Sequence, residues 1–233
     1  MFIVTHCSAH RLSLASCDAS DASSMVPRFQ QILNQIYVFF SRSFVRTAEL
    51  SEMRKALNEP HLKLQQPTET RWLSHQNAVD APRRCLNAVY TTLQQEAAER
   101  AEATAYGLCK EIEKPEFIAS LLLLSNILAV LGNLSCTFQL PQFNLLVVKQ
   151  LVTDTKAALN VIKENPLDGG YMTELEATME ALDIPKELDR DSFITPATPL
   201  TMLEIGESLQ IDGRKLWQEY TGYKSLACHS HRV

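Results

Sequence analysis

The sequence lacks the short motifs that mark many nucleotide-binding and hydrolytic sites. Its 233 residues contain no GxxxxGK[ST] phosphate-binding loop, no GxGxxG dinucleotide loop, no HExxH zinc motif and no GxSxG nucleophile turn. No Ser-His-Asp or Cys-His arrangement stands out by spacing, although catalytic groups of this kind assemble in space rather than along the chain. The enzyme classes that depend on these motifs therefore lose support.

The sequence also has no CxxC pair among its six scattered cysteines. Its first ten residues, MFIVTHCSAH, do not form the apolar core of a secretory leader. We therefore expect free intracellular thiols, mostly buried, and not a disulfide framework.

A zinc site is the alternative use of the cysteines nearest the two ends of the chain. Cys7 and His10 have the spacing of half a site, and Cys228 and His231 could complete a Cys2His2 set. The two halves lie at opposite ends of the sequence, far from the spacing of a zinc finger. A buried cysteine and a hydrogen-bonded histidine are therefore the favoured interpretation, and we expect no cofactor.

A general excess of positive charge is missing as well, since the formal net charge is −5. The charge is uneven, however: residues 26–72 carry seven basic and four acidic residues, whereas residues 164–191 carry nine acidic and two basic residues. Only the first of these regions has a charge balance suited to phosphate.

Charged residues are absent between positions 117 and 148, where the sequence is rich in leucine. A membrane-spanning helix needs about 20 predominantly apolar residues. This run is interrupted by Ser120, Ser125, Asn126, Gly132, Asn133, Ser135 and Gln139. We therefore predict a buried core helix and no membrane partner.

Helical periodicity dominates the first two thirds of the chain. The wide apolar stripe of the first long helix comprises Phe29, Ile32, Leu33, Ile36, Tyr37, Phe40 and Phe44. A helix starting near Trp72 has one apolar face, made of Val79, Leu86, Val89, Tyr90, Leu93 and Ala97. Pro82 lies inside that helix and predicts a kink or break there. The only predicted strand is FIVT, at residues 2–5.

The segment NPLDGG at 165–170 is the clearest boundary in the sequence. The following chain, residues 166–233, is expected to be an acidic linker and C-terminal tail, partly disordered.

The Arg71-Trp72 pair at the start of a predicted helix has two interpretations. Thr70 is a suitable N-cap, and a tryptophan in the first helical turn is most often a packing anchor. The alternative is that its ring stacks on a nucleic-acid base.

An ordered set of motifs resembles the hAT superfamily of cut-and-paste DNA transposases, and more closely its domesticated vertebrate zinc-finger-type relatives. The set consists of CSAHRL at 7–12, IYVFFSRSFVR at 36–46 and TRWLS at 70–74. The resemblance covers about residues 5–165. It implies an RNase H-like fold with a helical insertion, in which two metal ions are held by Asp, Asp and Glu. By the same resemblance, His10 lies beside the metal centre, Trp72 supports a base flipped out of the DNA stack, and Arg71 is a phosphate partner.

The sequence departs from this family at the catalytic carboxylates. Both aspartates belong upstream of the Cys-x-x-His element, and no strand–helix context is found for the closing glutamate. We therefore expect a truncated piece that is not an enzyme.

The sequence thus predicts a mainly α protein with a partial RNase H-like α/β remnant. The expected parts are 1–80, the RNase H-like region; 81–165, the helical insertion region; and 166–233, the acidic tail. The leading hypothesis is a catalytically incomplete, nuclear, transposase-derived fragment that retains weak DNA or protein binding through Trp72, Arg71 and His10. The alternative is a helical protein-interaction module without a nucleic-acid role, acting on a protein partner or as a homodimer.

Overall fold

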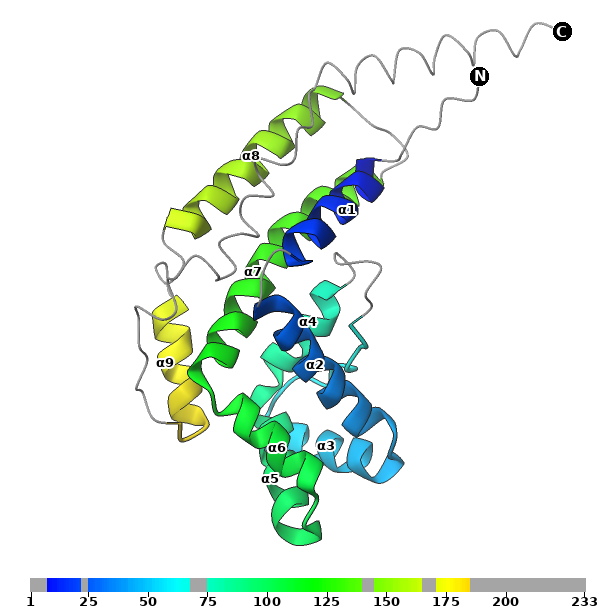
Figure 1. The fold of residues 1–233 in the computed structure, drawn as a ribbon, viewed down its shortest axis with the longest axis vertical. Helices are drawn as coiled ribbons and strands as arrows, with labels where there is room; N and C mark the ends of the chain where they lie inside the picture. The colour runs from blue at the N-terminus through cyan, green and yellow to red at the C-terminus, as the bar shows by residue number, and fades with distance from the viewer. Residues whose placement is uncertain (1–7, 22–24, 68–74, 140–144, 165–170, 185–233) are drawn as a thin grey trace, which may run out of the picture.

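The computed structural model describes residues 8–21, 25–67, 75–139, 145–164 and 171–184 (Figure 1). This part of the chain is mainly helical, as predicted, and contains no strand. Its helices are α1 (Ser8–Asp21), α2 (Met25–Ser41), α3 (Phe44–Ala56), α4 (His75–Arg84), α5 (Leu86–Arg100), α6 (Ala103–Ile112), α7 (Pro115–Phe138), α8 (Leu145–Glu164) and α9 (Tyr171–Ala181).

The α/β remnant expected at the N-terminus has no support in the described residues. The predicted strand at residues 2–5 lies outside them, and the first described segment is helix α1. The expected boundary at residue 80 lies inside α4, and the helices before it pack on helices after it: α2 on α6, and α3 on α5.

Helix α7 is the centre of the bundle. It contacts α1, α4, α6, α8 and α9, and Figure 1 shows it running through the middle of the molecule. It is the one helix among the described residues that is long and apolar enough to cross a membrane, and 78% of its most apolar window is buried inside the protein. Burial against five neighbouring helices explains why it is apolar all round, so the prediction of a buried core helix is confirmed.

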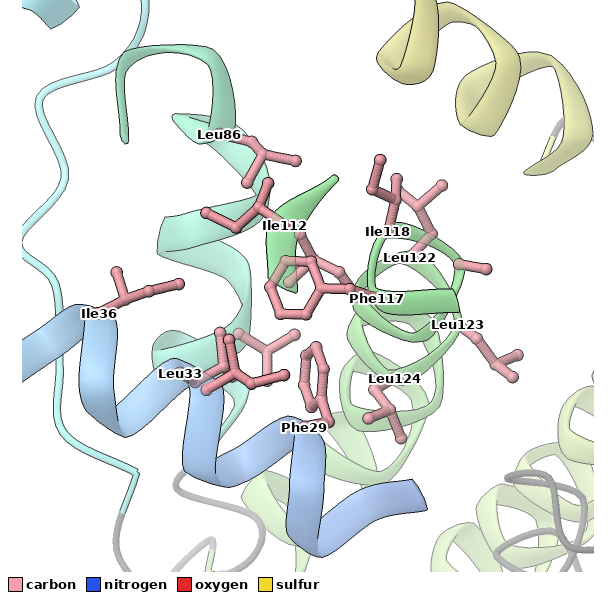
Figure 2. Packing of buried hydrophobic residues seen from close by; sticks show 14 of the residues in the cluster. Phe29, Leu33, Ile36, Leu86, Ile112, Phe117, Ile118, Leu122, Leu123 and Leu124 are labelled. Atoms are coloured by element: carbon pink, nitrogen blue, oxygen red, sulfur yellow. The ribbon is translucent and has the colours of Figure 1, made fainter. Parts of the chain in front are cut away.

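Helix α2 buries most of its predicted stripe, chiefly against α3 and α6, and its Phe29 reaches α7. Phe29 lies with its ring centroid 5.4 Å from that of Phe117 in α7, and Figure 2 shows the two rings facing each other below Ile112. The stripe ends earlier than predicted, because α2 stops at Ser41 and the Ser43 side chain caps a new helix. Phe44 is consequently 97% exposed at the start of α3, and its predicted place in the core is wrong.

The predicted break at Pro82 is confirmed. Helix α4 ends at Arg84, and Cys85 leaves the helical conformation with φ −132° and ψ 33° before α5 begins. Proline has no N–H to donate to the carbonyl four residues earlier, which weakens the helical ladder in the turn before the break at Cys85. The apolar face predicted on both sides of the break is buried, with Ala97 half-buried at its end.

Within the region expected to be an acidic linker and tail, residues 171–184 are described and folded. Helix α9 packs on α7, and Leu175, Met179, Leu182 and Ile184 are buried. The remaining residues, 185–233, lie outside the described part. The sequence prediction gave more weight to the net negative charge of this segment than to its apolar residues. In the structure, those apolar residues are the ones that pack against the bundle.

Candidate interaction surface

The DNA-handling residues expected from the resemblance are not brought together by the described structure. Arg71 and Trp72 lie outside the described residues, and His10 is exposed in the first turns of α1. Arg46, which belongs to the same basic region of the sequence, is held by the acidic residues Glu96 and Glu102.

The proposed zinc site cannot be described either, because Cys7, Cys228 and His231 lie outside the described residues. Within the described part, no group of three or more His, Cys, Asp or Glu side chains could hold a metal ion.

The cysteines in that part are free thiols, as predicted. Cys85 and Cys109 are buried, Cys17 is half-buried and Cys136 is exposed. Burial raises the pKa of the Cys85 thiol, and burial followed by the charge of Glu113 raises that of Cys109 to about 11. The two buried thiols are therefore protonated near neutral pH and poor nucleophiles.

Arg46 belongs to a charge network that ties α3 to the α5–α6 corner. Its Nε donates to Glu96 Oε2 at 2.9 Å, and its Nη2 donates to Glu102 Oε2 at 2.7 Å. Arg100 also donates to Glu96 and pairs with Glu49 at 2.6 Å. The Arg46 guanidinium further lies 4.0 Å from the ring centroid of Phe39. These partners hold the guanidinium in place as part of the fold.

A second internal cluster connects α3 to the break between α4 and α5. Arg54 is only 4% exposed, and its Nη2 lies 3.2 Å from Cys85 Sγ. Its Nε has no hydrogen-bond partner. Burial raises the pKa of the nearby Glu59 carboxyl, which accepts a hydrogen bond from the Ala88 backbone at 3.1 Å. This cluster is enclosed by helices, so its evident role is structural.

The open part of the surface is the face shared by α2 and α6. The two helices run antiparallel, because Arg28 near the start of α2 pairs with Glu111 near the end of α6 at 3.1 Å. At the other end, Arg42 lines the same pocket as Thr104, which lies in the first turn of α6.

A pocket of about 610 Å³ lies at the Arg28 end of this face. Buried Phe29, Ile32 and Phe117 contribute apolar walls, and charged side chains stand at the rim. Glu111 is shared by Arg28 and by Lys114, whose ammonium lies 2.6 Å from it. These contacts lower the pKa of Glu111, Lys114 contributing most. Its charge is therefore already compensated.

The other carboxylate of this pocket, Glu116, is exposed and forms no ion pair with another described residue. It stands in the first turn of α7, where the helix dipole favours a negative charge. Glu116 thus presents an unpaired anion at this end of the face.

A pocket of about 400 Å³ lies at the opposite end. Val38 and Phe39 line it together with the amides of Asn34 and Gln35 and with two arginines. Arg42 is exposed and makes no ion pair within the described residues, unlike Arg46. This end therefore presents an unpaired cation.

Two exposed positions lie between the charged ends of this face. Gln35 is exposed on α2, and Gly107 is exposed on α6 between Thr104 and Glu111. A Cβ added at Gly107 would have no heavy atom within 4 Å. We call the surface formed by Arg28, Gln35, Arg42, Gly107 and Glu116, with its two pockets, the α2–α6 face.

The sequence prediction missed this surface because it followed the apolar side of α2. The polar side carried a usable signal, since Arg28, Gln35 and Arg42 recur every seven residues and therefore lie along one line of the helix. The location of Glu116 beside Arg28 had no local signal, because it depends on how α7 packs against α2.

Comparison of the chain with protein-family models, with curated proteins and with solved structures finds no match in any of the three.

Proposed function

We propose that this chain is a helical protein-interaction module that docks its partner on the α2–α6 face. One observation carries the proposal: this face has two open pockets with apolar walls, and at its ends stand Arg42 and Glu116, two opposite charges without an ion pair among the described residues. The proposal assigns no enzymatic activity and no cofactor.

The composition of the face suits a docking surface. Protein interfaces combine an apolar centre with polar and charged groups that fix orientation, and arginine is enriched in them. Charges left without a partner gain most from a complementary surface, because each can form an ion pair on contact.

The function can be tested with a photo-crosslinking amino acid at position 35 of the full chain, expressed in cells. We expect discrete protein adducts that disappear when Gly107→Trp fills the middle of the face. The same crosslinker at Glu176, an exposed position on α9, is the control. Absence of adducts, or an identical adduct pattern from both positions, would contradict the proposed function.

A DNA-handling role at Arg71 and Trp72 is a second proposal, supported by the order of the transposase-like motifs along the chain. It places the protein in the nucleus and assigns His10 to the same site. The RNase H-like remnant expected in residues 1–80 belongs to this proposal, and the described residues of that region contain no strand. Enclosure of Arg46 by Glu96 and Glu102 weakens it, since the basic region then has one fewer available cation.

A further inference from the structure

We infer that the partner of the α2–α6 face is a second copy of this chain, docked antiparallel so that Arg42 of each copy pairs with Glu116 of the other. The inference rests on the proposed function, because it identifies the occupant of the same face. It is carried by the placement of the two unpaired charges.

The two charges are related as a two-fold symmetric interface requires. In such an interface, a residue that contacts another is contacted by the same residue of the partner. An unpaired cation at one end and an unpaired anion at the other meet this condition, because rotation by 180° about the middle of the face exchanges the two ends. A partner that carries charge of only one sign could form an ion pair at only one of the two ends.

The dimensions of α2 fix where the symmetry axis passes. Arg28 and Arg42 are fourteen positions apart on the helix, or about 21 Å at 1.5 Å per residue. Glu116 lines the same pocket as Arg28. The midpoint of this span is Gln35, so the axis passes between Gln35 and the neighbouring part of α6.

The middle of the face permits the close approach that such an axis requires. Gly107 has no side chain, and the space above it is open. The exposed amide of Gln35 can both donate and accept a hydrogen bond, so it is able to pair with its own copy.

Other charged side chains lie beside Glu116 at each contact. Arg42 of one copy would approach Arg28, Glu111, Lys114 and Glu116 of the other, a set with no net charge. Because Glu111 is already bonded to both cations, Glu116 is the available acceptor. The covered area is set by two helices of at most 17 residues, so we expect an association at the weak end of protein interfaces, in the micromolar range.

Sedimentation equilibrium of the full chain, at about 1 to 100 µM and low salt, tests the inference. We expect a reversible monomer–dimer equilibrium. Arg42→Glu and Glu116→Arg should each weaken dimerisation about tenfold, the equivalent of 1.4 kcal/mol. The double variant with both changes restores opposite charges at each contact and should recover dimerisation to within a few-fold of the original.

Gly107→Trp should abolish the dimer while circular dichroism shows the helices retained and the unfolding midpoint is not lowered, since a Cβ at this position meets no neighbour in the monomer. The matched control is the double variant Lys63→Glu and Glu176→Arg, which reverses exposed charges elsewhere and should leave the dimer intact. Each of three results overturns the inference: a monomer at every concentration, a dimer insensitive to Gly107→Trp, or failure of the double charge swap to recover dimerisation.

In the crosslinking experiment, adducts of a mass other than twice 26.2 kDa would retain the proposed function and reject self-association, whereas absence of adducts would reject both.

Discussion

The Arg46 guanidinium donates a 2.9 Å hydrogen bond to the carboxylate of Glu96, a glutamate that is only 3% exposed. The pair joins the start of α3 to α5 across fifty positions of sequence. Arg100 bonds the same carboxylate from within α5, so the buried negative charge of Glu96 has two cationic partners.

Removal of Glu96 should therefore destabilise the fold. Glu96→Ala leaves Arg46 without its buried partner, and we expect a loss of about 1 to 3 kcal/mol in the free energy of unfolding. Urea denaturation followed by circular dichroism measures it. Glu99→Ala, an exposed neighbour on the same helix, should stay within about 0.5 kcal/mol of the unchanged protein. Equal effects of the two substitutions would contradict the role given to Glu96.

The free energy of unfolding should fall in acid, because carboxylates in and beside this network become protonated there. A hydrogen bond from Arg100 lowers the pKa of Glu49 below 4.5, and hydrogen bonds from Thr104 and then Arg46 lower that of Glu102. A lowered folded-state pKa gives stability that is present above the unfolded-state value and is lost as pH falls through the folded-state value. Glu59, whose pKa is raised by burial, acts in the opposite sense.

Thermal unfolding measured between pH 6 and pH 3 checks this expectation. The melting temperature should be flat in the upper part of the range and fall below about pH 4.5. The double variant Glu49→Gln and Glu102→Gln should show a shallower fall, because its side chains no longer titrate. A steeper fall in this variant would show that the ionised Glu49 and Glu102 side chains do not stabilise the fold in the way proposed.

Truncation in the middle of α7 should cost more than truncation at the surface. Leu128 is fully buried, so Leu128→Ala should lower the free energy of unfolding by about 2 to 5 kcal/mol through lost burial and a residual cavity. Val161→Ala, at a position that is 62% exposed on α8, is the comparison and should change it little. Chemical denaturation of both variants provides the measurement.

Replacement of Arg83 should loosen the attachment of α9 to the rest of the bundle. This side chain donates to Glu174 of α9 at 2.6 Å and to Ser125 of α7 at 3.2 Å. Arg83→Gln should speed hydrogen exchange of the α9 amides selectively, because the pair is half-exposed and contributes to local rather than global stability. Arg84→Gln, whose partner Asp80 lies in its own helix, should leave α9 protected.

The DNA proposal predicts weak, salt-sensitive binding of duplex DNA. Trp72→Ala and Arg71→Ala should each reduce it in a fluorescence anisotropy titration at low salt, through loss of stacking and of a phosphate contact. Lys149→Ala removes an exposed cation from α8 and is the control for charge alone. No binding at low salt, or binding unchanged by both substitutions, would reject the retained DNA site.

Most of the helical fold could be predicted from the sequence, because apolar residues at spacings of three and four identify a buried helical face wherever that face packs. The stripe of α2, the core helix α7 and the break at Pro82 were all recognisable in this way. Phe44 could not be placed, because Ser43 starts a new helix there and turns the phenylalanine outwards. Helix α9 was missed because its buried Leu175 and Met179 lie within an acidic segment.

Sequence alone therefore determined most of the buried face of α2, α5 and α7, since that depends on local periodicity and backbone chemistry. Only the tertiary structure decided which charges are available to a partner. Arg42 and Arg46 are four positions apart and have the same side chain, yet Arg46 is held by Glu96 and Glu102 from other helices while Arg42 has no ion-pair partner within the described residues. The difference comes from the packing of α3 against α5, and such long-range placement is not encoded in the spacing of neighbouring residues.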